Sequence, residues 1–438
     1  MCIRDSTYDV VLERRPAGER HVIPKPAGYG VSPWMKGFGH QAFPMFGLGS
    51  VWEYRRIVDG AALGRTDLSI MNWGVGGNDY PFGGIIDVTP DEAATQLTRA
   101  RERALAYVYW LQTEADGRGY PFLKMRSDVL GTTTGVAKMP YIRESRRLRG
   151  LETVKVEDIS DAYNRGSARA RTFRYSVGIG LYPMDMHQNV AEGTGYPRGH
   201  SLPFEVPLGA LIPERIDGLL AGAKNLGTTH LTSSAYRLHP VEWATGEAAG
   251  TLAAMCVSWR KEPRAVFSNE ANARELQERL LTEGAPLYWV DDVAPDAPGW
   301  RDVQLVAASD IMGGPELGTL HFRPDATLTR AQAAAALVPA LGVETRAATG
   351  TFTDVPASHW AAAAIEALAR TGIVQGTGNG TFSPDALVTR LQMQVMIGRS
   401  LGDPVARAAV SSADAAPMSR GQAATALARA YRARLHLP

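Results

Sequence analysis

The segment Leu219 to Ala254 carries the residue types best suited to holding a flat, charged ligand. It reads as a strand ending in Ala-Gly-Ala, then a loop, then a helix opened by Gly246-Glu-Ala-Ala-Gly250. Small residues at a helix start let the backbone approach a ligand closely, and the helix dipole there favours a phosphate or an electron-rich ring edge. Close helix packing explains the same small residues, so both interpretations stay open.

Two further groups of side chains have the chemistry to move protons or bind anions. His187 follows Asp185 in an alternating, strand-like pattern, which suits an acid/base, a substrate contact or a hydrogen-bonded structural histidine. Three arginines within five residues suit either an anionic group or an ion-paired surface: Arg143, Arg146 and Arg147. Cys256, late in an alanine-rich stretch, fits a core position.

These side chains need helices and strands to position them, and the sequence predicts several. Thr89-Pro-Asp-Glu92 is a capping box with proline at the first helical position, followed by an apolar stripe that ends before Gly117. Short buried strands are predicted at 175–182 and 218–223, a buried helix at 243–259, and a charged linker helix at 261–288.

Composition narrows the class of protein. The 438 residues suggest two or three domains, and 45% hydrophobic with 21% charged residues is ordinary for a globular chain. The net charge of +1 provides no field that would attract nucleic acid. The sequence has no His-Glu-x-x-His motif, no Walker loop and no Cys-x-x-Cys pair, so we expect no metal site.

Between 289 and 438 the sequence repeats itself. Six identities share an offset of 60 residues: Trp300/Trp360, Phe322/Phe382, Pro324/Pro384, Asp325/Asp385, Thr329/Thr389 and Arg330/Arg390. A Ser/Thr-x-x-Gln capping box opens a helix at Thr329, Thr389 and Ser419. Each repeat therefore reads as two helices joined by a Phe-x-Pro-Asp loop, and in the third repeat the first helix is shortened or lost.

The segment Leu219 to Ala254 resembles the closing segment of FAD-dependent oxidoreductases of the glutathione-reductase-like superfold. Upstream, five stretches stand in the order typical of the bacterial FAD-dependent oxidoreductase family: 52–56, 72–80, 109–112, 140–147 and 178–187. The resemblance implies FAD as cofactor and a place near the flavin ring for His230, Arg237 and His239. The cofactor residues that it implies are Gly222, Asn225, Thr245, Gly246, Glu247, Ala248, Ala249 and Gly250.

Members of that family begin with a Gly-x-Gly-x-x-Gly turn that holds the pyrophosphate, and this sequence has no such motif. Residues 1–6 resemble a sequencing artefact joined to a reading frame that began further upstream. We therefore expect a fragment that lacks the dinucleotide-binding N-terminus and a signal peptide. We also expect the chain by itself to purify without flavin.

The repeats resemble S-layer-homology modules through Phe352-Thr-Asp-Val355, Phe382-Ser-Pro-Asp385 and Thr389-Arg390. The resemblance implies binding to cell-wall polysaccharide through an arginine at the start of each second helix: Arg330, Arg390 and Arg420. A helical packing appendage without ligand contacts is the alternative, because glutamine replaces the acidic residue often found after the arginine.

The expected fold is α/β, a partial FAD-binding fold with a substrate domain, followed by an all-α repeat module. The expected divisions are an artefact at 1–6, a substrate or cap region at 7–200, the C-terminal part of the FAD-binding domain at 201–260, a linker helix at 261–288, and repeats at 289–342, 343–402 and 403–438.

The expected activity is hydride transfer from an unknown organic substrate to FAD. The expected catalytic residues are His187, Arg143 and His230. The repeats predict a location in the cell envelope or outside the cell, and the expected partners are a small-molecule substrate and wall polysaccharide, with no nucleic acid and no transmembrane segment. A non-enzymatic glycan-binding envelope protein is the main alternative, and a carbohydrate-active lyase is a third possibility without a matching set of residues.

Overall fold

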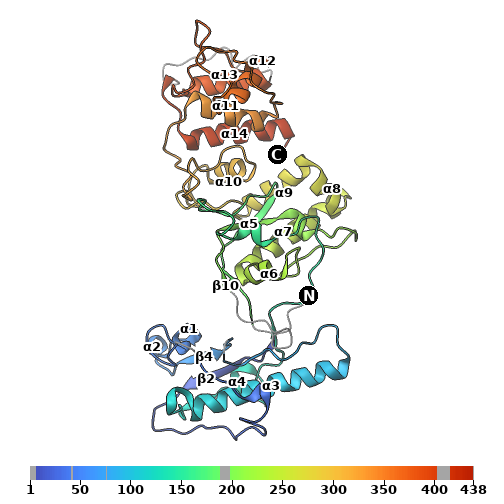
Figure 1. The fold of residues 1–438 in the computed structure, drawn as a ribbon, viewed down its shortest axis with the longest axis vertical. Helices are drawn as coiled ribbons and strands as arrows, with labels where there is room; N and C mark the ends of the chain where they lie inside the picture. The colour runs from blue at the N-terminus through green and yellow to red at the C-terminus, as the bar shows by residue number, and fades with distance from the viewer. Residues whose placement is uncertain (1–5, 41–42, 75, 188–197, 402–414, 438) are drawn as a thin grey trace. The chain divides into compact units, whose positions relative to one another are not determined.

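The computed structural model describes residues 6–40, 43–74, 76–187, 198–401 and 415–437. The chain is mixed α/β and divides into two compact units, which Figure 1 shows in the colours of the sequence. Unit 1 consists of Met1–Arg146 and Met184–Gly199, and unit 2 consists of Arg147–Pro183 and His200–Pro438.

Unit 1 is built on a four-stranded antiparallel sheet and one long helix. The sheet has the order β3-β4-β2-β6, with strands Arg56–Val58, Leu68–Met71, Val10–Arg14 and Leu123–Met125. Helix α3 (Pro90–Thr113) shares one apolar core with β2, in which Tyr107, Val108 and Leu111 are fully buried. The capping box predicted at Thr89 is confirmed, whereas the helix ends four residues before Gly117, at Thr113. The short helices of unit 1 are η1 (Pro33–Met35), α1 (Val51–Tyr54), α2 (Gly60–Leu63), η2 (Ala115–Gly117) and α4 (Ser127–Leu130).

A second sheet of unit 1 joins segments that are far apart in the sequence. Its order is β5-β1-β7, formed by Asp79–Tyr80, Ser6–Thr7 and Tyr141–Ile142. Thr7 lies opposite Asp79 on one side and opposite Tyr141 on the other. Nearby in sequence to His187, β9 (Met184–Asp185) pairs with β10 (Arg198–Gly199). These short strands fix the positions of the backbone segments that carry the candidate functional residues of unit 1.

Unit 2 begins with a two-stranded antiparallel sheet of β8 (Ser176–Gly180) and β11 (Phe204–Pro207). The strand predicted at 175–182 is thus confirmed over its central residues. Helix α7 (His239–Trp259) packs on β8, and the glycines of the strand make room for it. A Cβ at Gly178 would lie 2.9 Å from Cβ of Ala244. The remaining short elements of this part are α5 (Val156–Ile159), η4 (Leu208–Leu211) and α6 (His230–Tyr236).

Two predictions about the segment Leu219 to Ala254 are wrong. Residues 218–223 form no strand, because Gly218 takes a left-handed φ of 67° and the segment makes a single backbone bond to η4, from Ala221 N–H to Leu211 C=O (2.9 Å). The helix does not open at Gly246 but at His239, because Pro240 fits its first turn. Gly246 therefore lies about two turns inside α7. The helix buries one face only, and Trp243 on the other face is 78% exposed.

The segment 261–288 contains two helices, α8 (Pro263–Ser268) and α9 (Glu270–Thr282). Helix α9 is packed on both sides. Gln277 Nε2 donates to the backbone carbonyl of Ser176 in β8 (2.7 Å), and Arg274 Nε donates to the hydroxyl of Tyr431 near the C-terminus (2.8 Å). The segment predicted as a linker therefore contributes to the core of unit 2.

The repeat region is helical in the part of it that the structure describes. Its helices are α10 (Trp300–Ala308), α11 (Arg330–Leu341), α12 (Ala362–Arg370), α13 (Arg390–Leu401) and α14 (Arg420–Leu435). The three capping boxes are present, since each predicted glutamine bonds back to its Thr or Ser. The predicted shortening of the third repeat falls mainly on 402–414, outside the described residues.

The repeated motifs make equivalent hydrogen bonds in different repeats. The carboxylate of Asp292 accepts the backbone N–H groups of Phe322 and Arg323, and that of Asp354 accepts those of Phe382 and Ser383. Three residues that precede the capping boxes close a ring of backbone hydrogen bonds, from Leu328 N–H to Met418, from Met418 N–H to Val388 and from Val388 N–H to Leu328. Because the ring needs all three repeats, the third repeat completes the arrangement.

Candidate functional site

Asp79 is the centre of a buried polar network in unit 1. Its side chain is 2% exposed, and its two oxygens have different partners. Oδ1 accepts from Nη1 of Arg143 (2.6 Å) and from the hydroxyl of Thr7, while Oδ2 lies 2.5 Å from Nδ1 of His187. The structure therefore brings together two of the three predicted catalytic residues, His187 and Arg143, through an aspartate to which the sequence analysis assigned no role.

The network holds Arg143 on all sides. Its Nη1 also donates to Thr7 Oγ1 (2.7 Å) and its Nη2 donates to Asn72 Oδ1 (2.6 Å), whose own amide donates to Asp9 Oδ1 (2.9 Å). The side chain of Arg143 is only 6% exposed, and its guanidinium donates hydrogen bonds to Asp79 and Asn72. These contacts favour a positioning role, in place of a direct contact with an anionic substrate.

Charge pairs set the proton affinities in this network. Burial alone would raise the pKa of Asp79, but Arg143 and His187 outweigh it and hold that pKa well below its usual range. Burial alone would lower the pKa of His187, but Asp79 and Asp185 raise it. Asp9 differs, because burial raises its pKa to about 6 against the opposing effects of Asn72 and Arg143.

The other two arginines of the 143–147 cluster have separate surroundings. Arg146 pairs with Asp87 on the surface, where both side chains are more than half exposed. Arg147 belongs to unit 2, where its Nε donates to the backbone carbonyl of Thr228 (3.2 Å). Of the three, Arg143 is the one whose described hydrogen bonds lie in the buried network.

The residues predicted to hold the cofactor belong to unit 2 and fall into two groups. Thr245, Ala248 and Ala249 are buried in α7, and the Thr245 hydroxyl donates to the backbone carbonyl of Val241 (2.8 Å). The others are exposed or half-buried: Gly222, Asn225, Gly246, Glu247 and Gly250. A Cβ at Gly246 would lie 3.2 Å from the carbonyl oxygen of Gly222, whereas at Gly222 and Gly250 it would meet no described atom within 4 Å.

His230, the third predicted catalytic residue, is the first residue of α6 in unit 2. Arg237 is the C-cap of the same helix and is 5% exposed, and His239 is the first residue of α7. Arg237 and His239 thus lie at the junction of α6 and α7, and His230 lies at the opposite end of α6. Cys256 is half-buried on α7, less enclosed than the predicted core position.

The three arginines predicted to bind glycan differ in their surroundings. Arg330 and Arg420 are 4% and 5% exposed and lie over the rings of Phe382 and Phe322. Their Nε groups donate to the backbone carbonyls of those phenylalanines, at 2.9 and 2.8 Å. Arg390 is half-buried, and its Nε has no hydrogen-bond partner among the residues that the structure describes.

Two other motifs carry no catalytic geometry. A Gly-x-Ser-x-Gly string begins at Gly398, but Ser400 lies in the last turn of α13 and its hydroxyl donates to the Ile397 carbonyl (2.7 Å), unlike the strand-to-helix turn of a serine hydrolase. Exposed ligand atoms of Asp291, Asp292 and His321 lie within 4.8 Å of one another, yet the Asp292 carboxylate is already used by backbone N–H groups.

A sequence model of FAD dependent oxidoreductases matches residues 26–280, which is more than half of the chain. The chain belongs to the FAD-dependent oxidoreductase family. The S-layer homology domain matches at 291–334 and 351–393, so the predicted resemblance is confirmed in both parts. Among the described residues, no helix combines the length and hydropathy that a membrane crossing requires.

The curated relatives of this FAD-dependent oxidoreductase resemble it over short segments. A cell surface protein of Thermoanaerobacter kivui is 34% identical over 116 residues, 25% of this chain and 15% of that protein. Outer membrane protein SlpA of Thermus thermophilus is 50% identical over 50 residues, 11% of this chain and 6% of that protein. A cellulosome-anchoring protein of Acetivibrio thermocellus is 37% identical over 75 residues, 16% of this chain and 17% of that protein.

The chain thus spans less than a fifth of each of these three relatives. Together with the S-layer homology domains, the relatives indicate that this oxidoreductase is located in the cell envelope or outside the cell.

The residues present fit FAD in part. No described atom lies within 4 Å of a Cβ built on Gly222 or Gly250, so the backbone there is open to a ligand. No Gly-x-Gly-x-x-Gly turn is present in the sequence to bind the pyrophosphate. The α7 segment is therefore open at these glycines, and the phosphate-side motif is absent from the sequence.

Proposed function

We propose that this chain is an FAD-dependent oxidoreductase that removes a hydride from an organic substrate and is held at the cell envelope by its S-layer homology repeats. The family match over residues 26–280 carries the proposal. When bound, FAD supplies the hydride acceptor, and the protein supplies binding, orientation and proton transfer. The substrate is a small organic molecule whose oxidation releases a proton as well as a hydride.

The cofactor residues of the proposal are the ones that remain open in unit 2. Gly222, Asn225, Gly246, Glu247 and Gly250 would contact the flavin ring, and the buried residues Thr245, Ala248 and Ala249 would keep α7 against its strand. This division follows from burial, because a buried alanine offers no surface to a ligand. The proposed fold is a partial FAD-binding fold with a substrate domain, followed by an all-α repeat module.

For proton transfer we propose His187, with His230 as the second candidate. His187 has the stronger support, since two carboxylates lie next to its ring nitrogens, Asp79 at 2.5 Å and Asp185 at 3.5 Å. A positively charged imidazole is stabilised in such a setting, which suits a group that accepts a proton from a substrate.

For the tether we propose that the repeats bind cell-wall polysaccharide, as S-layer homology domains do. The cell surface relatives support this proposal. Among the predicted arginines, Arg390 is the best placed to contact the polysaccharide. The Nε groups of Arg330 and Arg420 already donate to backbone carbonyls of neighbouring repeats.

The test is FAD binding by the purified chain, measured as quenching of flavin fluorescence. We expect the chain to purify without stoichiometric flavin and to bind added FAD weakly, because the phosphate-side motif is absent. Gly250→Trp should abolish binding by filling the open surface, whereas Ser258→Trp, at an exposed position farther along α7, should not. No binding by the unmodified chain, with wall binding retained, would favour the non-enzymatic envelope protein instead. Equal binding by both variants would remove α7 from the site.

A further inference from the structure

We propose that Asp79 is the positioning residue of His187, holding a proton on Nδ1 so that Nε2 is the nitrogen that exchanges a proton with the substrate. The inference rests on the proposed function for the role of His187. It extends that function to a residue outside the predicted set, and its geometry can be tested without flavin or substrate.

The protonation state of the pair follows from the charges around it. Asp79 is enclosed by protein and faces the cationic guanidinium of Arg143 at 2.6 Å and the imidazole of His187 at 2.5 Å, so the carboxylate is ionised. An ionised carboxylate only accepts hydrogen bonds. Nδ1 of His187 must therefore carry the proton of the short contact, and the neutral ring has its lone pair on Nε2.

Asp79 is also fixed in orientation. Arg143 Nη1 and the Thr7 hydroxyl both donate to Oδ1, which leaves Oδ2 for the imidazole. Because Thr7 and Asp79 face each other across β1 and β5, the backbone register sets the position of the carboxylate. The hydrogen bonds that join Arg143, Asp79 and His187 therefore hold the imidazole ring of His187, and they start from the second sheet of unit 1.

The backbone also leaves little freedom to the imidazole itself. A Cβ on Gly74 would lie 3.1 Å from Cε1 of His187 and 3.5 Å from Oδ2 of Asp79. A side chain at position 74 would thus press on the contact between the two groups. The glycine allows the loop after β4 to pass close to them.

The charged groups that face His187 include Asp79, Asp185 and Arg143. Asp185 is 20% exposed, more than Asp79, and its Oδ2 lies 3.5 Å from Nε2. In the proposed step a substrate O–H bond breaks, its proton bonds to Nε2 and its electron pair stays on the substrate oxygen. The resulting imidazolium is stabilised by Asp79, which stays ionised throughout.

The experiment is a histidine NMR titration of the 438-residue chain with labelled imidazole nitrogens. The His187 resonance is assigned by its loss in His187→Gln. We expect neutral His187 to carry its proton on Nδ1 in the wild-type protein. Asp79→Asn should lower the proton affinity of His187 by tenfold or more, which is one pKa unit. The matched control is Asp87→Asn, which removes the same charge from an exposed pair in unit 1.

The wild-type tautomer needs no variant, so the inference can be refuted even when Asp79→Asn fails to fold. A neutral His187 protonated on Nε2 would overturn it. So would a folded Asp79→Asn protein whose His187 titrates as in the Asp87→Asn control. The Nδ1 tautomer without FAD binding would uphold the geometry and count against the proposed function alone.

Discussion

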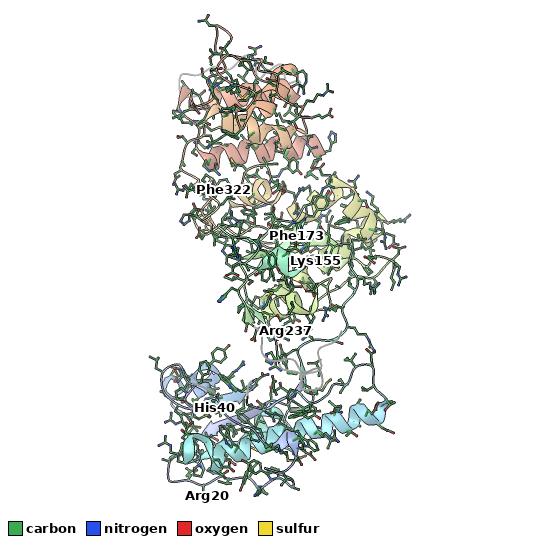
Figure 2. The ribbon with its side chains drawn as sticks, in the orientation of Figure 1. Arg20, His40, Lys155, Phe173, Arg237 and Phe322 are labelled. Atoms are coloured by element: carbon green, nitrogen blue, oxygen red, sulfur yellow. The ribbon has the colours of Figure 1, made fainter. Side chains whose placement is uncertain are left out.

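Glu205→Gln should make the stability of unit 2 less dependent on pH. Glu205 lies on β11, fully enclosed, and its Oε2 accepts the backbone N–H of Phe173 (2.7 Å), a residue labelled in Figure 2. Burial raises the pKa of Glu205 to about 8, with Asp310 adding to the effect and Arg169 and Arg274 opposing it. At neutral pH the native protein therefore keeps a proton on this carboxyl that the unfolded chain releases.

The direction and size of this pH effect follow from the linkage between proton binding and folding. Between the ordinary value of 4.5 and about 8, the native state binds more protons than the unfolded state, so the free energy of unfolding falls as the pH rises. At about 1.4 kcal/mol per pKa unit, the loss over this window is about 5 kcal/mol. Gln cannot ionise and keeps an acceptor for the Phe173 N–H, so the variant should not show this loss.

The assay is urea unfolding of the full chain at several pH values between 5 and 8, followed by circular dichroism. Relative to wild type, Glu205→Gln should gain stability steadily with pH. Glu344→Gln, at a side chain that is 84% exposed, is the control and should follow the wild type throughout. Parallel curves for Glu205→Gln and wild type at every pH would refute the reasoning, because they would mean that the carboxyl titrates alike in both states.

Three further substitutions, the last with a matched control, test local contacts. Asp9→Asn should stabilise unit 1 above pH 7 by about 3 kcal/mol and lose the advantage by pH 4, since burial raises the pKa of Asp9 to about 6; urea unfolding at both pH values checks this. Gly74→Ala should displace the His187 ring and lower its proton affinity in the histidine titration. Gly246→Val should cost about 1–3 kcal/mol by overpacking, read from thermal unfolding, whereas Gly250→Val should be nearly neutral because no described atom lies within 4 Å of its Cβ.

Local chemistry made much of the fold predictable. The capping boxes at Thr89, Thr329 and Ser419 depend on side chains three residues apart, and all three form as predicted. The 60-residue offset likewise predicted the alternation of helices in the repeats. Asp292 and Asp354 accordingly accept the backbone N–H of the equivalent phenylalanines, Phe322 and Phe382.

The wrong predictions concern segments whose secondary structure depends on tertiary contacts. The start of α7 was placed at Gly246 because its small residues suggested ligand contact, but Pro240 and the packing on β8 extend the helix back to His239. The strand predicted at 218–223 had the apolar residues of a strand and no neighbouring strand to pair with among the described residues. Apolar composition alone does not distinguish a strand from an extended segment.

Asp79 shows the same limit within the candidate site. Its partners come from residues 7, 143 and 187, on three separate segments, so no spacing in the sequence connects them. The only available signal was its place in the stretch 72–80 that resembles the family. Pairing of β1 with β5 and β7 is what brings these charges into one network.

The repeat arginines allow fold and ligand binding to be separated. Arg420 donates from Nε to the carbonyl of Phe322, the residue labelled in Figure 2, and from Nη2 to that of Gly313 (2.5 Å). Arg330 makes the same pair of contacts with Phe382 and Gln375. Replacement of either by Met leaves two backbone carbonyls without these donors, and each replacement should cost about 1–3 kcal/mol.

Arg390→Met should behave differently, because its Nε has no hydrogen-bond partner within the described residues. We expect its thermal unfolding to stay close to wild type while co-sedimentation with purified cell-wall polysaccharide falls at least tenfold. Arg420→Met should instead lower the unfolding temperature, and it should lose binding only where the repeats unfold. A stable Arg420→Met variant would show that the carbonyl contacts contribute little. Full polysaccharide binding by a folded Arg390→Met protein would remove this arginine from the proposed tether.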